Sequence, residues 1–304
     1  MLDLRGERGR WFGGIGASVS SPTLLLSASR ASELSVEGED ADRGSEFARR
    51  FLRHHGIDTG ARIVVHRSLP PHAGLGSGTQ LALAVARALA DIYGCTSEPR
   101  ELARAVGRGR RSAIGTWTFA GGGLVVEGGR PPEGDRSGPL IARLQFPPAW
   151  RCVVAVPDGP PGISGADEAA AFARLKKPPE RDVERAAHLV LMTLLPALAD
   201  ADIDMFGRAL TEIQEITGQW FAEAQGGTFA PGPGRGLVRR FAEWGAAGVG
   251  QSSWGPAVYG IVDGADASRH LAERAREALG SAERVYEGPF CSEGARVWRA
   301  KEMP

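Results

Sequence analysis

The stretch Pro70-Pro71-His72-Ala73-Gly74-Leu75-Gly76-Ser77-Gly78-Thr79-Gln80 decides how the rest of the chain is interpreted. Three alternating glycines follow a Pro-Pro stop and lead into an Ala- and Leu-rich segment, 79–93, which is typical of a helix. Glycines let backbone N–H groups approach an anion closely, and the positive end of the helix points at the same spot. We therefore predict a phosphate-binding loop, against the plainer interpretation of a capped helix start. Its expected ligands are Gly74, Gly76, Ser77, Gly78 and Thr79.

This loop matches neither of the two commonest phosphate motifs. No lysine follows Gly78, so it is not a Walker A loop, and its spacing is GxGxG where dinucleotide sites have GxGxxG. Around it, the β-branched runs 62–66 and 152–156 predict buried strands. The end of the chain predicts a strand at 257–262, a helix at 267–279 and a last strand at 295–299. Together these elements resemble a small split βαβ unit. The predicted class is α+β, with domains at 1–150 and 151–304.

The composition of the 304-residue chain excludes several classes of protein. Its 36 Lys and Arg balance 36 Asp and Glu, so there is no basic excess for nucleic acid or for a membrane surface. The longest apolar run, 189–199, is too short to cross a bilayer, and the start has no signal-peptide pattern. The cysteines Cys95, Cys152 and Cys291 form no CxxC pair, which fits a reducing compartment. We expect a cytoplasmic protein.

A second glycine-rich segment, 107–115, carries an arginine cluster and precedes the strand expected at 121–127. Guanidinium groups bind phosphate oxygens in bidentate fashion, so Arg110, Arg111 and Ser112 are candidate catalytic residues. The alternative is a solvated charged turn. We expect Arg108, nearer the preceding helix, to contribute less.

A third glycine-rich segment, 248–256, offers Ser252 and Ser253 as hydroxyl donors. Trp254 lies beside them, either stacking on an aromatic substrate or serving as a core residue. A long Gly/Pro loop, 157–168, contains Asp158 and Glu168, which are candidates for Mg²⁺ or for ribose hydroxyls. A plain surface loop is the alternative there.

At this point the sequence resembles a known family. PPHAGLGSGT is similar to the phosphate loop of the GHMP kinase superfamily, which includes galactokinase and the homoserine and mevalonate kinases. The similarity is stronger to one branch, the β-ribofuranosylaminobenzene 5′-phosphate synthases of methanopterin biosynthesis. It extends over HAGLGSGTQLALAVARAL (72–89), GRGRRSAIGTWTFAGGGLVVEGG (107–129), PDGPPGISGADEAAAF (157–172), EIQEITGQWFAEAQGGTF (212–229) and GQSSWGPAVYG (250–260).

The resemblance implies a GHMP-kinase-like two-domain fold, with an N-terminal half like a ribosomal-protein domain and a ferredoxin-like C-terminal half. It also implies a reaction in which 4-aminobenzoate, or 4-hydroxybenzoate, condenses with 5-phosphoribosyl 1-diphosphate. The products are a C-riboside 5′-phosphate, CO₂ and diphosphate. Mg²⁺ is expected, no organic cofactor is needed, and a homodimer is the family expectation. Gln225, inside one of the similar stretches, is a further candidate for substrate binding.

The sequence departs from the kinases of the superfamily at one position. Those kinases often carry a Ser-Gly-x-Asp element whose Asp serves the acceptor hydroxyl, and the corresponding residues here are Ser112-Ala113-Ile114-Gly115. No lysine precedes Lys176, so kinases with an N-terminal lysine have no counterpart either. Members of the branch usually carry a further strand of the type RLHFG before LDLRG, and we expect any site residue on that strand to lie outside this sequence. An ATP-dependent small-molecule kinase and a catalytically silent phosphosugar-binding protein remain as alternatives.

Overall fold

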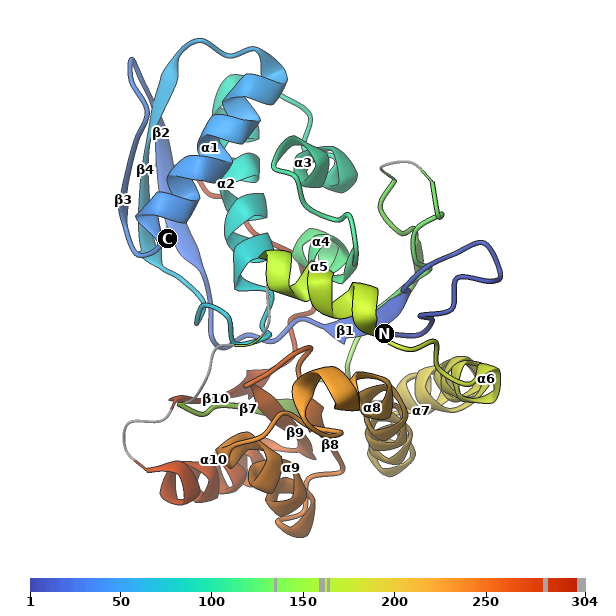
Figure 1. Ribbon diagram of the computed structural model, residues 1–304. Helices are drawn as coiled ribbons and strands as arrows, with labels where there is room; N and C mark the ends of the chain where they lie inside the picture. The colour runs from blue at the N-terminus through green and yellow to red at the C-terminus, as the bar shows by residue number, and fades with distance from the viewer. Residues whose placement is uncertain (134–135, 159–161, 163–164, 281–283, 300–304) are drawn as a thin grey trace.

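The computed structural model describes residues 1–133, 136–158, 162, 165–280 and 284–299. The upper half in Figure 1 is a three-stranded sheet of order β2-β4-β3, with α1 and α2 on one face and α3 beyond them. Strands β3 and β4 are parallel and are joined by α1, while β2 runs antiparallel to β4. The bounds are β2 (Leu25–Ala31), β3 (Ser35–Gly38), α1 (Ala41–His55), β4 (Gly60–Arg67), α2 (Ser77–Tyr93) and α3 (Pro99–Ala105).

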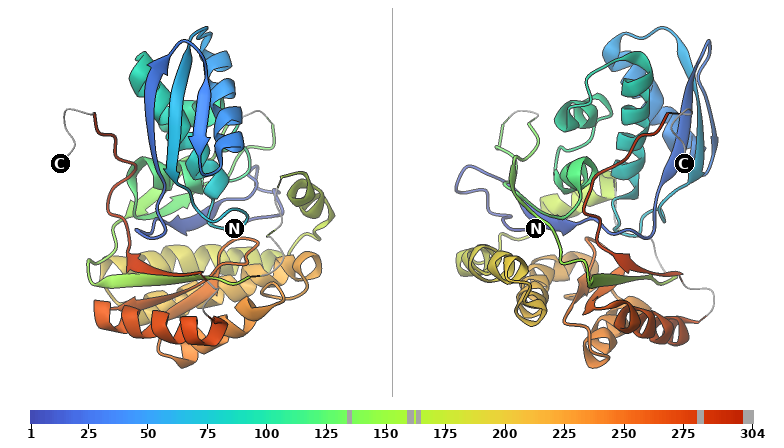
Figure 2. Two further views of the ribbon diagram at one scale, coloured as in Figure 1. Left: turned by 90° about the vertical axis from the view of Figure 1, so that its left-hand side faces the viewer. Right: turned by 180° about the vertical axis from the view of Figure 1, so that it is seen from behind.

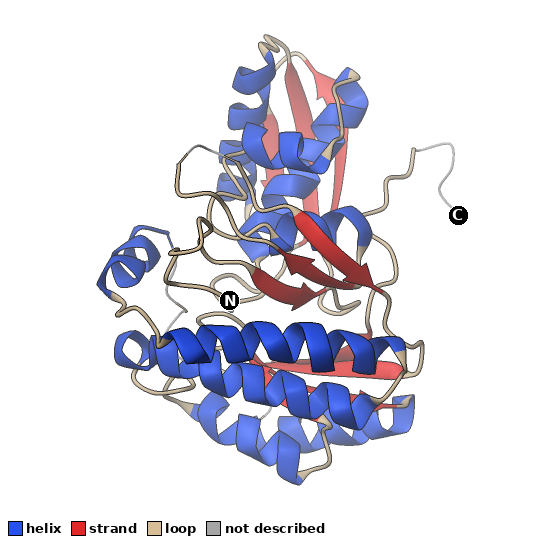
Figure 3. Ribbon diagram, turned by 90° about the vertical axis from the view of Figure 1, so that its right-hand side faces the viewer, coloured by secondary structure: helices blue, strands red, loops and turns tan. Residues whose placement is uncertain are grey.

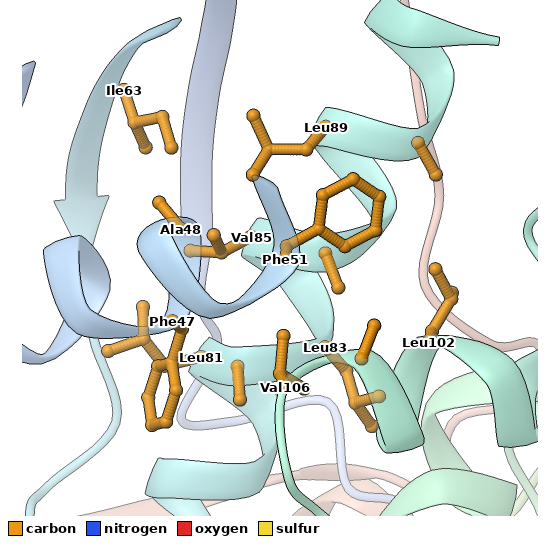
Figure 4. Close-up of a cluster of buried hydrophobic side chains, with 14 of the residues drawn as sticks. Phe47, Ala48, Phe51, Ile63, Leu81, Leu83, Val85, Leu89, Leu102 and Val106 are labelled. Carbon is orange, nitrogen blue, oxygen red and sulfur yellow. The ribbon is translucent and has the colours of Figure 1, made fainter. Parts of the chain in front are cut away.

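An apolar core holds α1 and α2 on this sheet (Figure 4). Phe47 and Phe51 come from α1, spaced four residues apart, so both side chains lie on one face of the helix. Ile63 of β4 and Leu89 of α2 are fully buried against them. The apolar face of α2 therefore fixes the direction in which its N-terminus points.

A second three-stranded sheet lies in the middle of the molecule, in the order β1-β5-β6, with all neighbours antiparallel. Helix α4 (Ile114–Gly121) connects the arginine-rich segment to this sheet. The strands are β1 (Gly14–Ala17), β5 (Leu124–Glu127) and β6 (Leu140–Leu144).

The lower half is a four-stranded antiparallel sheet of order β10-β7-β9-β8. Strands β9 and β10 both run antiparallel to β7 between them, so β9, α10 and β10 form a split βαβ unit, whose last strand is β10 and not the predicted 295–299. Helices cover this sheet, and Figure 3 shows them in front of its strands. The bounds are β7 (Trp150–Val156), α5 (Gly165–Arg174), α6 (Glu180–Leu189), the π-helical turn η1 (Val190–Leu194), α7 (Leu195–Ala199), α8 (Ile203–Gln225), α9 (Pro233–Glu243), β8 (Gly248–Gln251), β9 (Val258–Asp263), α10 (Ala265–Leu279) and β10 (Arg284–Pro289).

Strand β7 alternates between two cores. Val153 and Ala155 face α9 and α10, whereas Cys152, Val154 and Val156 point the other way, as the period of two in a strand requires. This second face of β7 packs against Ala73 and Leu75 of the glycine-rich loop. The loop from the upper half is thereby seated on the sheet of the lower half.

Two expected elements differ in the structure. The last strand is β10, and the predicted strand 295–299 is wrong. That segment rises from β10 along the upper half (Figure 2), where Ala295 N–H donates to the Phe119 carbonyl of α4 (2.7 Å), so it lies against a helix and has no strand to pair with. The arginine-rich segment leads into α4 before the expected strand, β5. None of the helices in the described ranges is both long and apolar enough to cross a membrane.

Candidate functional site

The glycine-rich loop ends in an uncapped helix N-terminus. Gly76 is the N-cap of α2 with a left-handed φ of 69°, which glycine adopts without strain. No side chain caps this end, and the first turn of α2 holds no acidic residue. Thr79 and Gln80 donate their N–H groups to the Gly76 carbonyl (2.9 and 3.0 Å), whereas the N–H groups of Ser77 and Gly78 have no intrahelical acceptor. The loop therefore presents free donors and a positive dipole end, as an anion site requires.

The third glycine-rich segment holds this loop in place. Ser252 Oγ donates to the Gly74 carbonyl (2.9 Å), and Ala257 N–H donates to the Ala73 carbonyl (3.1 Å). A Cβ on Gly74 would overlap the Ser252 carbonyl oxygen, so the close approach depends on glycine at this position. The structure thus brings together the two segments that the sequence marked 178 residues apart.

The arginine-rich segment joins the same region through an ion pair. Arg111 Nη1 lies 2.7 Å from Glu168 Oε2 on α5, and Glu168 Oε1 accepts a hydrogen bond from Trp254 Nε1 (3.2 Å). Glu168 therefore contacts both Arg111 and Trp254, which come from two other segments singled out in the sequence. Figure 1 shows α5 lying between the upper and lower halves, close to the start of α2.

Trp254 belongs to an aromatic cluster. It is 7% exposed, and its ring meets Phe172 and Phe221 edge to face, with centroids 5.6 and 4.9 Å apart. The guanidinium of Arg111 lies 5.7 Å from the centroid of Phe172. This geometry favours the interpretation of Trp254 as a core residue that also orients a carboxylate.

The other predicted residues lie at the edge of this region. Arg110, Ser112 and Ser253 are exposed, and Ser112 Oγ accepts from Ile114 N–H at the start of α4 (3.3 Å). Gly115 packs so closely on Thr79 that a Cβ there would lie 2.8 Å from the Thr79 methyl group. A carboxylate-bearing side chain at position 115 would therefore displace the loop.

Gln225 makes hydrogen bonds within the protein. Its Nε2 donates to the carbonyls of Gly227 (2.9 Å) and Thr228 (2.8 Å), and its Oε1 accepts from Gln251 Nε2 (3.2 Å). Gly226 is the C-cap of α8 with φ 83°, as expected for a helix-ending glycine. Gln225 thus ties the end of α8 to the third glycine-rich segment, while a direct contact with substrate stays a prediction.

The candidate metal ligands do not form a site on their own. Glu168 is engaged by Arg111 and Trp254, and Asp158 is an exposed residue just after β7. Within the described residues, no group of three His, Cys, Asp or Glu side chains could hold a metal ion. Since Mg²⁺ commonly takes only one or two carboxylates together with substrate phosphates, a metal would have to come with its phosphate ligands.

One buried carboxyl group escaped the sequence analysis. Glu127 at the end of β5 is 1% exposed, and its Oε2 accepts from Gly129 N–H (2.8 Å). Burial raises the pKa of Glu127, and hydrogen bonds from the N–H groups of Gly129 and Ala113 oppose that rise. The Glu127 carboxyl group thereby holds the turn at Gly129. Its position at the end of a strand gave no signal of this role.

Comparison with known proteins agrees with the fold. The pattern of the GHMP kinases N terminal domain matches residues 44–122, and that of the GHMP kinases C terminal domain matches residues 194–283. A protein of Methanothermobacter thermautotrophicus, named beta-ribofuranosylphenol 5′-phosphate synthase, is 37% identical over 284 residues, covering 86% of this chain and 85% of that protein. Its namesake from Archaeoglobus fulgidus is 36% identical over 275 residues, covering 86% and 84%.

This chain belongs to the β-ribofuranosylphenol 5′-phosphate synthase family of the GHMP kinase superfamily. The solved structure of L. major mevalonate kinase in complex with R-mevalonate superimposes with a TM-score of 0.69 at 17% identity, covering 97% of this chain and 94% of that one. The GHMP-kinase-like α+β fold expected from the sequence is confirmed. The domain boundary near residue 150 stays a prediction.

Proposed function

We propose that this synthase condenses 5-phosphoribosyl 1-diphosphate with 4-hydroxybenzoate or 4-aminobenzoate, releasing CO₂ and diphosphate. The observation that carries the proposal is the similarity to the two synthases over 86% of the chain. The site supports it, because the N-terminus of α2 has no side-chain cap and the glycine-rich loop before it is held in place by Ser252. The name of the two relatives refers to a phenol, which favours 4-hydroxybenzoate as the acceptor.

The proposed reaction is an exchange at one ring carbon. The ring carbon that bears the carboxylate attacks the anomeric carbon of the ribose. At the same time, the bond between the anomeric carbon and the diphosphate oxygen breaks. The carboxylate then leaves as CO₂, and its bonding electrons restore the aromatic ring, so no external proton or oxidant is needed. The 4-hydroxyl or 4-amino group donates electron density into the ring during the attack.

In the proposed reaction, residues of this chain stabilise the charge on the leaving diphosphate and keep water out of the site. Negative charge grows on the leaving diphosphate in the transition state, so the N–H groups of Ser77 and Gly78 are placed to stabilise it. Arg111, fixed by Glu168, is a candidate for the same task. Mg²⁺ bound to the diphosphate would neutralise further charge, with Asp158 as the candidate carboxylate. The aromatic cluster of Phe172, Phe221 and Trp254 closes one side of this region against water, which would otherwise hydrolyse the donor.

An ATP-dependent kinase is the second candidate, since the fold is shared with mevalonate kinase. Gly115 argues against it, because the position that carries an acceptor-activating Asp in many kinases has no side chain and lies against Thr79. Incubation with ATP and an alcohol, or with the phosphoribosyl donor and the aromatic acid, separates the two. If the phosphoribosyl donor is consumed together with the aromatic acid and ATP is not consumed, the synthase is supported. If phosphate is transferred from ATP to the alcohol, the kinase is supported instead.

We also propose a homodimer, as the family resemblance implies, and a cytoplasmic location, because the three widely spaced cysteines fit a reducing compartment. Light scattering of the purified protein would test the first. Fractionation of cells would test the second.

A further inference from the structure

Two arginines from other elements reach the N-terminus of α2. Arg43 lies in the first turn of α1, and Arg108 follows α3. A Cβ on Gly78 would lie 2.8 Å from Arg43 Nη2 and 3.1 Å from Arg108 Nη2. Both guanidinium groups therefore lie directly over the first turn of α2, and glycine at position 78 leaves them room.

The protein neutralises only part of this positive charge. Arg43 pairs with Asp40 (Nη1–Oδ2 3.2 Å). Arg108 takes part in no ion pair within the described ranges, and its buried Nε has no acceptor there. Its guanidinium instead lies 4.9 Å from the centroid of the Phe47 ring. Burial and the neighbouring charges of Arg43 and Arg50 lower the pKa of Arg108, and the charges of Glu46 and Glu168 offset only part of this shift.

The end of α2 adds to the positive potential. It has no side-chain cap, so it contributes its dipole and the N–H groups of Ser77 and Gly78. Two guanidinium forks at one helix N-terminus suit an anion with oxygens on more than one phosphorus atom.

We propose that Arg43 and Arg108 bind the diphosphate group of the donor at the N-terminus of α2. The identity of the donor rests on the proposed function, whereas the charge arrangement does not. Arg108 then becomes a principal ligand, which reverses the expectation that it would contribute less than Arg111. The Arg111 guanidinium is instead paired with Glu168 on α5.

Binding of magnesium diphosphate to the full chain, measured by isothermal titration calorimetry, tests this directly. Arg108→Gln and Arg43→Gln should each weaken binding roughly tenfold to a hundredfold, the size of a lost charge-assisted hydrogen bond. Arg108→Lys should fall between Arg108→Gln and the wild type, because it keeps the charge and loses the fork. Arg49→Gln, an exposed position on the same helix as Arg43, is the matched control and should bind as the wild type does.

The outcomes separate this inference from the proposed function. Binding by both Gln variants at wild-type affinity, or no binding by the wild type, would overturn the inference even if the donor is turned over. If diphosphate binding depends on Arg43 and Arg108 while no donor is consumed with either aromatic acid, the inference stands and the proposed function fails. Equal melting temperatures of the variants exclude a loss through unfolding.

Discussion

Arg111 and Glu168 form an ion pair of 2.7 Å between Nη1 and Oε2, with about a third and a quarter of the two side chains exposed (34% and 27%). The pair links the segment after α3 to α5, two parts of the chain that meet only in the folded protein. An arginine held by a carboxylate at one edge keeps its remaining N–H groups in a fixed direction. Substitution of either residue can therefore test whether this ion pair orients Arg111.

Arg111→Leu should lower kcat as well as donor affinity. If charge develops on oxygens bound to this guanidinium as the bond to diphosphate breaks, its loss costs about 2–4 kcal/mol, or tens to several hundred-fold in rate. Arg111→Lys should recover only part of the loss, because an ammonium group lacks the bidentate fork. Steady-state kinetics with both variants checks this, with Arg239→Leu on the exposed face of α9 as the control. Wild-type turnover by Arg111→Leu would show that the arginine-rich segment 107–115 is only a solvated turn.

Glu168→Gln should raise the KM for the donor more than it lowers kcat, since Glu168 orients Arg111 and is not itself required to touch the donor. In a double-mutant cycle with Arg111→Lys, the two losses in kcat/KM should overlap, with a coupling of about 0.5–3 kcal/mol. Additive losses would mean that the two residues act separately. A metal role of Glu168 would instead appear as a changed dependence on Mg²⁺ concentration.

Gly74→Ala should destabilise the protein more than Gly76→Ala. Both glycines have a left-handed φ (82° and 69°), which costs an alanine about 1–2 kcal/mol. Only the Cβ at position 74 meets the Ser252 carbonyl, whereas nothing lies within 4 Å of a Cβ at position 76. Overpacking should add about 1–3 kcal/mol at position 74. Urea unfolding of the two variants compares them, and equal losses would show that the contact between the loop and Ser252 does not matter.

Glu127→Gln should change how stability depends on pH. Burial raises the pKa of Glu127 above its usual 4.5 in the folded protein, so the folded state binds this proton more tightly than the unfolded state. The resulting stabilisation is complete below the unfolded pKa and is lost as pH rises through the folded pKa, with a slope of at most about 1.4 kcal/mol for each pH unit. The free energy of unfolding of the wild type relative to Glu127→Gln should therefore decline as pH rises above the unfolded pKa of this carboxyl group and level off above its raised folded pKa. A difference that grows with pH would contradict the raised pKa.

The sequence could predict the parts of the site that carry local signals. Local residue patterns predict three of its loops: the alternating glycines before α2, the arginines after α3 and the Ser-Ser-Trp turn after β8. The contacts of Glu168 with Arg111 and Trp254 depend on how α5 packs, which no local pattern contains. Arg43 could not be found in this way, because it lies in an ordinary amphipathic helix and only the packing of α1 on α2 brings it to Gly78.

The differences in the fold have the same origin. The segment 295–299 lies along helix α4, which offers no strand edge, so it forms no ladder. The segment 284–289 becomes the last strand because it lies opposite β7. Whether a segment forms a strand depends on the strand that lies beside it, and a local sequence pattern does not identify that neighbour.

The most direct test of the account is the stoichiometry of the products when the protein is given Mg²⁺, 5-phosphoribosyl 1-diphosphate and 4-hydroxybenzoate or 4-aminobenzoate. Labelled CO₂ from the carboxylate and inorganic diphosphate should appear in equal amounts, and neither should form when the aromatic acid is left out. Diphosphate release that continues undiminished without the aromatic acid would contradict the coupled reaction.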